Sequence, residues 1–185
     1  MTKVLLVTPG QTNWDTEDRI QGSLSVPLNA HGVVQIARLA AEPRSQQFDV
    51  IYTGESQGAV QTANILAKVW GAKVRKTPQL NEVDLGLWQG LLQSEVARRF
   101  ARGYRRWLRD PLSVEPPEGE TIDAAYARVA GEVRQILKRH RAEGVCLVCR
   151  PMAGAVVKCY LKDLDIRDVL KLRLECGCCE MIERR

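Results

Sequence analysis

Short apolar runs alternate along the chain with longer stretches in which apolar residues recur every three or four positions. The short runs lie at residues 3–7, 49–53 and 145–149. The longer stretches lie at residues 29–41, 56–70 and 121–141. The first kind is typical of strands buried between helix layers, and the second of amphipathic helices. Their alternation predicts βαβ units and therefore a three-layer α/β/α sandwich with a largely parallel central sheet.

Local signals set the boundaries of several of these elements. Asn29 and Thr121 stand where a helix N-cap is needed, and Gly71 follows the second helix as a stop signal. Pro151 can occupy the first position of a helix, where its missing N–H has no cost. Less regular patterns predict a helix at 91–109 and strands at 73–76, 169–174 and 178–182.

A length of 185 residues is in the range of one domain with a substantial core. We therefore predict a single domain over residues 1–185. The segment at about residues 85–120 is rich in turn-forming residues and interrupts the alternation of predicted strands and helices. It is predicted to form an insertion within that domain.

The composition is that of an ordinary globular protein, with 45% apolar and 26% charged residues. No apolar run approaches the roughly 20 residues needed to cross a bilayer. The first apolar stretch is also too short for a signal peptide. We therefore expect a cytoplasmic protein without a membrane partner.

The net charge of +5 is concentrated in one arginine-rich segment. Its arginines are Arg98, Arg99, Arg102, Arg105, Arg106 and Arg109. One interpretation is a polyanion-binding module. The alternative is a solvated helix whose apolar side carries Val96, Phe100, Tyr104 and Trp107. We favour the helix and do not expect nucleic acid as a partner, because no aromatic-rich RNA-binding signature accompanies the arginines.

All six cysteines fall in the last 40 residues, at positions 146, 149, 159, 176, 178 and 179. Free thiols are expected in a cytoplasmic protein. Cys146 and Cys149 would point to opposite faces of a strand, which is poor geometry for sharing a metal ion. The two histidines, His31 and His140, are predicted at the surface. We expect no cofactor or metal ion, although a zinc or redox role of the cysteines is the alternative.

Six motifs occur in a fixed order along the chain. The first is Leu-Val-Thr-Pro-Gly-Gln-Thr-Asn-Trp-Asp at residues 6–15. The others are Arg19-Ile-Gln-Gly22, residues 25–32, Phe48–Tyr52 with Ala59–Ala63, Leu80–Gly90 and Glu118–Thr121. Together they resemble the motifs of the histidine phosphatase superfamily, the phosphoglycerate mutase-like proteins, over nearly the whole chain. This resemblance implies a phosphoglycerate mutase-like α/β fold.

The resemblance also implies where the family's chemistry would lie. The nucleophilic histidine falls on Pro9, and the arginine beside it on Thr8. The second arginine falls on Gly58, and the second histidine on Arg150. Because a phosphohistidine mechanism requires an imidazole and cationic phosphate ligands, these replacements remove it. Glu82 remains at the position of the family's general acid.

We therefore expect that the protein is not an enzyme but a catalytically inactive pseudophosphatase with a binding or regulatory role. The predicted ligand-binding residues are Arg19, Glu82 and Arg150, with an unknown small anion or a protein as the partner. Glu82 and Arg150 are predicted to form an ion pair. Arg150 is also a candidate anion ligand together with the N–H groups of the following helix.

Two alternatives remain open. The first is a phosphatase- or mutase-family enzyme with altered chemistry, acting on a small phosphorylated metabolite and using Glu82, Asp15 or Cys149. The second is the polyanion-binding module described above.

Overall fold

A mixed sheet with helices on both faces organises the molecule. The computed structural model describes residues 2–43, 46–140 and 144–184, and within them five strands form one sheet in the order β3-β2-β4-β1-β5. The strands are β1 (Thr2–Val7), β2 (Val50–Thr53), β3 (Lys73–Lys76), β4 (Gly144–Val148) and β5 (Cys179–Arg184). The predicted α/β/α architecture with a largely parallel sheet is confirmed, since β5 alone among these strands pairs antiparallel.

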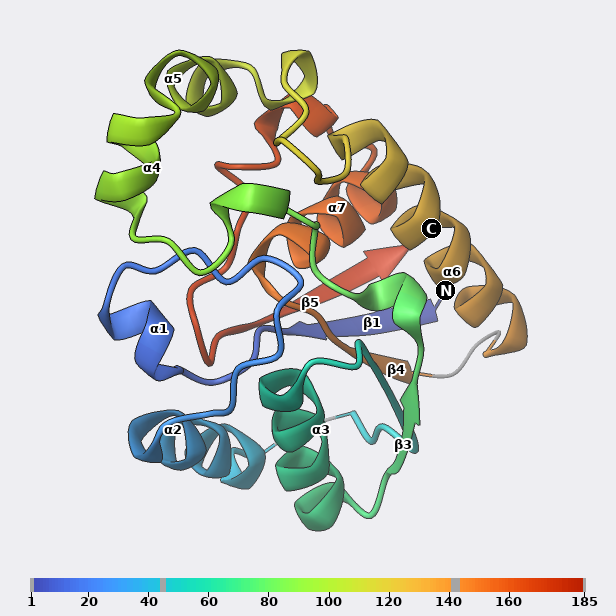
Figure 1. Cartoon of the computed structure of the whole chain (residues 1–185). Helices are drawn as coiled ribbons and strands as arrows, with labels where there is room; N and C mark the ends of the chain where they lie inside the picture. The colour runs from blue at the N-terminus through green and yellow to red at the C-terminus, as the bar shows by residue number, and fades with distance from the viewer. Residues whose placement is uncertain (1, 44–45, 141–143, 185) are drawn as a thin grey trace.

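The two faces of the sheet are covered by different helices (Figure 1). One face packs on α2 (Ala30–Ala41) and α3 (Gln57–Trp70), and the other on α6 (Ile122–Arg139) and α7 (Pro151–Lys162). Successive strand residues alternate between these layers: Leu5 belongs to the first apolar cluster, whereas Leu6 belongs to the second. Both are at least 98% buried, so the strands have the two-sided apolar character that their sequences predict.

Capping residues begin and end these helices as predicted. Asn29 accepts a hydrogen bond from the N–H of Gly32 at the start of α2, and Thr121 accepts one from the N–H of Ala124 at the start of α6. Gly71 ends α3 in the left-handed conformation, with φ of 70°. Such caps satisfy the N–H and C=O groups that helix ends leave unpaired.

A third group of short elements lies outside the sheet and the four helices that cover it. These are α1 (Asn13–Thr16), α4 (Gln93–Arg99), α5 (Ala101–Arg109) and the 3-10 turns Pro78–Leu80, Gly86–Trp88, Pro111–Ser113 and Ile166–Asp168. In Figure 1, α4 and α5 lie at the periphery, away from the sheet. Val96, Tyr104 and Trp107 are buried there while the arginines are exposed, so the predicted apolar side of this segment is confirmed.

Three boundaries differ from the sequence-based predictions. The predicted helix at 91–109 is broken at Phe100, whose φ of −119° and ψ of 33° are not helical. The predicted strand at 169–174 is wrong, because these residues form turns that continue from the Ile166–Asp168 helix. The helix from Thr121 ends at Arg139, and its predicted end at residue 141 lies outside the described residues.

Among the described residues, no helix is both long and apolar enough to cross a membrane.

Candidate active site

The carboxyl ends of β1 and β4 bring two of the predicted segments together. The N–H of Cys149 donates to the carbonyl of Val7 at 3.0 Å, so Thr8-Pro9 and Arg150-Pro151 leave the sheet side by side. The segment before β5 closes over them, because the Thr8 N–H donates to the Cys178 carbonyl at 2.9 Å. Ligands of parallel sheets bind at this edge, which makes it the candidate site.

Three of the positions that the resemblance singles out carry neither an imidazole nor a cationic side chain. Pro9 is buried after β1 and has neither a side-chain lone pair nor an N–H. Thr8, 2% exposed, offers one hydroxyl. At Gly58 the backbone comes close to Val26, whose carbonyl would lie 2.9 Å from an added Cβ. A larger side chain at position 58 would therefore require the Val26 segment to move.

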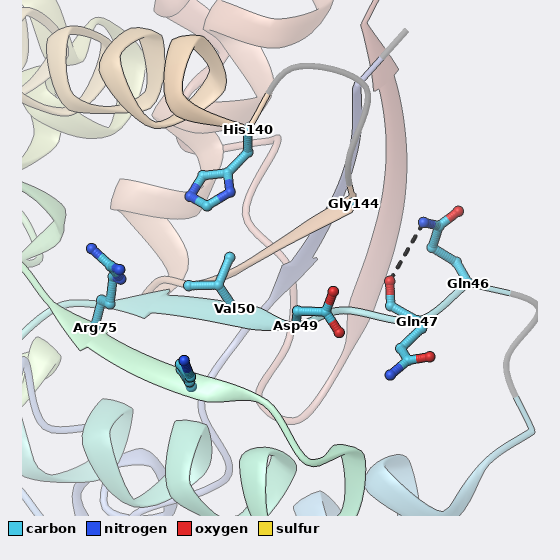
Figure 2. A pocket seen from close by; sticks show the side chains of 8 residues that line it. Gln46, Gln47, Asp49, Val50, Arg75, His140 and Gly144 are labelled. Atoms are coloured by element: carbon cyan, nitrogen blue, oxygen red, sulfur yellow. Dashed lines mark hydrogen bonds between the residues drawn. The ribbon is translucent and has the colours of Figure 1, made fainter.

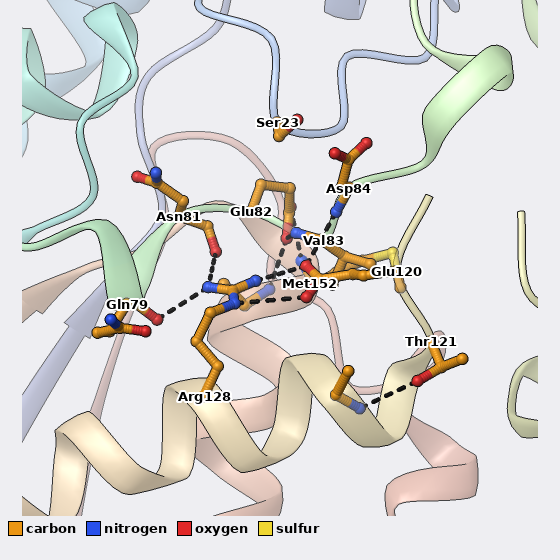
Figure 3. Close-up of polar contacts among 12 residues, drawn as sticks. Ser23, Gln79, Asn81, Glu82, Val83, Asp84, Glu120, Thr121, Arg128 and Met152 are labelled. Atoms are coloured by element: carbon orange, nitrogen blue, oxygen red, sulfur yellow. Dashed lines mark hydrogen bonds and ion pairs between the residues drawn. The ribbon is translucent and has the colours of Figure 1, made fainter. Parts of the chain in front are cut away.

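Glu82 is placed as the N-terminal cap of α7 (Figure 3). Its Oε1 accepts hydrogen bonds from the N–H groups of Ala153 at 2.7 Å and Val83 at 2.9 Å. Its Oε2 accepts one from the N–H of Met152 at 3.0 Å. The carboxylate is 7% exposed, so these bonds replace the water it has lost. A carboxylate oxygen has two acceptor positions, which leaves one on Oε2 for a further partner.

An ion pair between Arg128 and Glu120 holds the segment that carries Glu82, and the sequence did not reveal it. Arg128 of α6 donates to the carbonyls of Gln79 and Asn81 and pairs with Glu120 (Figure 3). Glu120 in turn accepts from the N–H of Asp84 at 3.0 Å. The sequence predicted no role for Arg128 or Glu120, because this ion pair binds backbone groups rather than a ligand.

Arg150 lies on the wall of a cavity of about 230 Å³ beside Glu82 and Pro151. The residue is buried, with 9% exposed, and its Nε has no hydrogen-bond partner among the described residues. The predicted ion pair with Glu82 is wrong, since no such contact within 4.0 Å occurs among the described residues.

The physical reason is that α7 uses Glu82 as its cap. The N–H groups of Met152 and Ala153 bind this carboxylate, Gly154 donates to the carbonyl of Arg150, and Pro151 has no N–H. The first turn of α7 therefore has no free donor, and the predicted cooperation of Arg150 with helix N–H groups is also wrong.

A hydrogen-bond network around Asp15 of α1 forms another part of the cavity wall. The Asp15 carboxylate accepts from the N–H and hydroxyl of Thr12 and from the Gln21 amide, at 2.7–2.8 Å. Asp15 and Gln21 line the cavity together with Glu82 and Arg150.

Arg19, predicted as a ligand-binding residue, does not line this cavity. It pairs with Glu17, donates to the carbonyl of Gly90 and lies over the Trp14 ring. The structure thus brings together two of the three predicted ligand-binding residues.

A family model for the histidine phosphatase superfamily (branch 1) matches residues 4–185. The chain belongs to this superfamily. It is 31% identical over 166 residues to phosphoserine phosphatase 1 of Hydrogenobacter thermophilus, spanning 90% of this chain and 79% of that protein. It is 30% identical over 165 residues to a metal-independent phosphoserine phosphatase of Arabidopsis thaliana, and the match spans 88% of this chain and 68% of that protein.

Solved structures agree on the fold of this superfamily member. Bacillus stearothermophilus YhfR superimposes with a TM-score of 0.91 at 24% identity, covering 99% of this chain and 91% of that one. A mycobacterial glucosyl-3-phosphoglycerate phosphatase in complex with VO3 superimposes with a TM-score of 0.87 at 25% identity, covering 97% of this chain and 91% of that one.

These comparisons overturn the prediction of a catalytically inactive pseudophosphatase. Relatives that the chain matches over most of its length are named as phosphatases, and the described residues do not show that this superfamily member is inactive. The prediction equated the loss of the phosphohistidine route with the loss of all chemistry. The structure retains a polar cavity and a carboxylate at the general-acid position.

The cysteines do not supply the superfamily's missing nucleophile. Burial, followed by the nearby Glu82 carboxylate, raises the pKa of the Cys149 thiol far above its ordinary value, so it is not a thiolate at neutral pH. Burial and Asp15 raise the pKa of Cys176 to about 11, although Arg150 opposes them. All six cysteines are free thiols, and no metal-ligand cluster occurs among the residues with described positions.

The histidines stand away from this cleft. His31 is exposed on α2, as predicted. His140 is half-buried at the end of α6, and its Nε2 lies 3.0 Å from the Tyr52 hydroxyl. His140 borders a second cavity, of about 350 Å³, with Asp49, Lys73 and Arg75 (Figure 2). That cavity lies at the amino ends of the strands, opposite the edge where parallel sheets bind their ligands.

Proposed function

We propose that this chain is an enzyme of the histidine phosphatase superfamily that acts on a small phosphorylated metabolite without a phosphohistidine intermediate. The observation that carries the proposal is the position of Glu82. It is held rigidly by three backbone N–H groups on the wall of a polar cavity, and its Oε2 keeps one lone pair free. The relatives named as phosphatases support the substrate class.

The reaction proposed is hydrolysis by direct attack of water. The water oxygen forms a new bond to phosphorus, and the ester P–O bond breaks. The Glu82 carboxylate takes a proton at Oε2 from the attacking water and gives it to the leaving alcohol oxygen, so that it ends ionised as it began. Because Pro9 removes the covalent route that divides the reaction into two easier steps, slow turnover is expected.

The expectation that the chain is not an enzyme stays a prediction, and turnover is the measurement that decides it. Purified protein would be incubated with a panel of phosphomonoesters while released phosphate is measured. The proposal predicts turnover that Glu82→Gln abolishes and Glu132→Gln, the same change on α6 outside the cleft, leaves unchanged. Equal rates for both variants, or no release on any substrate, would refute it.

The same experiment tests the altered chemistry. Acid-quenched and base-quenched samples would be compared for phosphate bound to protein during turnover. Our proposal predicts none, since phosphohistidine is acid-labile but survives base, and position 9 has no imidazole. Base-stable phosphoprotein would contradict it.

We also propose that the enzyme acts in the cytoplasm. The free state of the six cysteines supports a reducing compartment, because disulfides form in oxidising ones. Fractionation of the source cells would test this.

A further inference from the structure

The helices α4 and α5 hold the charge of the whole chain on one exposed surface. Together they contain six arginines and one glutamate, a net charge of +5, which equals the net charge of all 185 residues. The rest of the chain is therefore neutral overall. All six arginines are exposed, and none forms an ion pair within the part of the chain that the structure describes. In Figure 1 both helices lie at the periphery, away from the sheet.

Four of these arginines share one face of α5, at positions i, i+3, i+4 and i+7 of the helix. They are Arg102, Arg105, Arg106 and Arg109. The opposite face of the helix carries Tyr104 and Trp107, which are buried in the core. At 1.5 Å per residue the four arginines extend over about 10 Å. Like charges at these spacings repel one another, so this face favours an anion that carries several charges and lies along the helix.

A shallow pocket of about 300 Å³ lies beside this face, and Arg102 belongs to both. Its apolar lining consists of Trp88, Phe100, Ala101, Gly103, Val114 and Pro117. Arg99 and Arg102 also line it, against one acid, Glu115. Phe100 is half-buried, so it contributes an aromatic surface beside two cations. The pocket therefore suits a flat apolar group that is attached to negative charges.

A single-stranded nucleic acid has this combination of groups. Proteins that bind single strands use a cationic groove for the phosphates and an aromatic side chain on which an unstacked base lies. All six cations are arginines, whose planar forks match phosphate oxygens in pairs. A duplex keeps its bases paired and stacked and would leave the pocket empty. A membrane is less suitable, because the apolar face of α5 is already buried in the protein.

We propose that α4 and α5 form a binding surface for single-stranded nucleic acid, with phosphates on the exposed arginines and one base in the pocket of Phe100. Nucleic acid is not expected from the sequence, which lacks an aromatic RNA-binding signature. The break between the two helices at Phe100 supplies the aromatic group that the sequence pattern does not display. The inference does not depend on the proposed function, since neither Glu82 nor Arg150 takes part.

Fluorescence anisotropy of a labelled 12-nucleotide oligouridylate measures the binding directly. If most of the six arginines contact phosphates, the logarithm of the association constant should fall with the logarithm of salt concentration with a slope of about −3 to −4. The duplex with oligoadenylate should bind less tightly, because its bases cannot enter the pocket. Absent or salt-insensitive binding, or a duplex that binds as tightly as the single strand, would overturn the proposal.

Charge variants locate the surface. Arg102→Gln and Arg105→Gln are each expected to weaken binding about 2- to 5-fold and to reduce the salt slope by about 0.7. Arg134→Gln makes the same charge change at an exposed position of α6 and should leave affinity nearly unchanged. Equal losses in all three variants would show that net charge alone attracts the oligonucleotide, and would overturn the assignment to α4 and α5.

Filling the pocket tests the base-binding half without a change of charge. A Cβ at Gly103 would meet no atom within 4 Å, and leucine is a better helix former than glycine, so Gly103→Leu should fold at least as stably. It should weaken oligouridylate binding about 5- to 100-fold, as the loss of one stacked base predicts, with the salt slope unchanged. Gly131→Leu, also in open space on α6, is the matched control. Equal affinities of these two variants would overturn the pocket assignment.

Two competitors test the other possible partners. Polyglutamate has the negative charges without bases, and vesicles of phosphatidylglycerol present an anionic membrane. At equal concentration of negative charge, both are expected to displace the oligonucleotide only weakly. Displacement by either one as effective as that by unlabelled oligouridylate would overturn the proposal in favour of an acidic protein or a membrane. Because every readout is binding, the result is independent of any phosphomonoester turnover.

Discussion

Replacing Glu82 by glutamine should destabilise the protein by an amount that the geometry fixes. Glu82 accepts three hydrogen bonds from backbone N–H groups, two at Oε1 and one at Oε2. A glutamine amide offers one oxygen and one NH₂ group in the same space. In the better of its two orientations it keeps the two Oε1 bonds and turns a donor toward the N–H of Met152.

The cost follows from the loss of that one contact in a buried place. A hydrogen bond to a charged group contributes about 1.5–3 kcal/mol, and the side chain is 7% exposed. For a chain of this size each kcal/mol lowers Tm by about 2–4 °C, so a decrease of about 3–12 °C is expected. Glu82→Ala removes all three acceptors and should lower Tm further than Glu82→Gln does.

Thermal and urea unfolding followed by circular dichroism measure both variants. Glu132→Gln is the control, since it makes the same chemical change at a half-buried position of α6 outside the cleft and should shift Tm by less than about 2 °C. A decrease below about 1 °C for Glu82→Gln, or equal losses for the Gln and Ala variants, would refute the assignment of Glu82 as the cap of α7.

Two further predictions concern stability away from the cleft. Gly32→Ala should destabilise the fold by more than about 2 kcal/mol, because its Cβ would lie 2.2 Å from a backbone oxygen, whereas Gly131→Ala in open space on α6 should stabilise it by about 1 kcal/mol; urea unfolding compares them. Burial raises the pKa of Glu180, but hydrogen bonds from Lys162 and Lys158 lower it below 4.5 overall. The stability that the ionised Glu180 carboxylate contributes is then fully present above the unfolded-state pKa and is lost as pH falls through the folded-state pKa. Glu180→Gln should therefore destabilise the protein at pH 7 and much less at pH 3. A loss that is equal at both pH values would contradict this.

The sequence predicted the elements whose residues repeat with a clear period. The strand at 3–7 and the helix from Ser56 to Trp70 appear within one residue of their predicted bounds. A continuous apolar run marks the strand, and one apolar face marks the helix. The stretch at 169–174 is equally apolar but lies in turns. Its Val169 is buried in the apolar cluster on the α6 and α7 side of the sheet without being part of a strand, and hydrophobicity alone does not distinguish these two kinds of burial.

The candidate site was predicted residue by residue but not in its contacts. The positions of Glu82 and Arg150 on one cleft followed from their motifs, yet their charges suggested an ion pair that does not form. Backbone N–H groups decide the partner of Glu82, and a sequence pattern of side chains does not display them. Gln21 and Trp88 stood within recognised motifs, but their places on the cavity wall became visible only with the packing around them.

The segment that precedes β5 determines when the cleft can form during synthesis. Residues 177 and 178 bind the backbone of Thr8 and Pro9, and β5 pairs with β1 along its whole length. β1 therefore gains its partner on this edge only after β5 has been synthesised. Such long sequence separation slows folding and leaves the edge of β1 unpaired on the emerging chain. β5 must therefore have left the ribosome before this side of the cleft is complete, and until then β1 has an unpaired edge that a chaperone can protect.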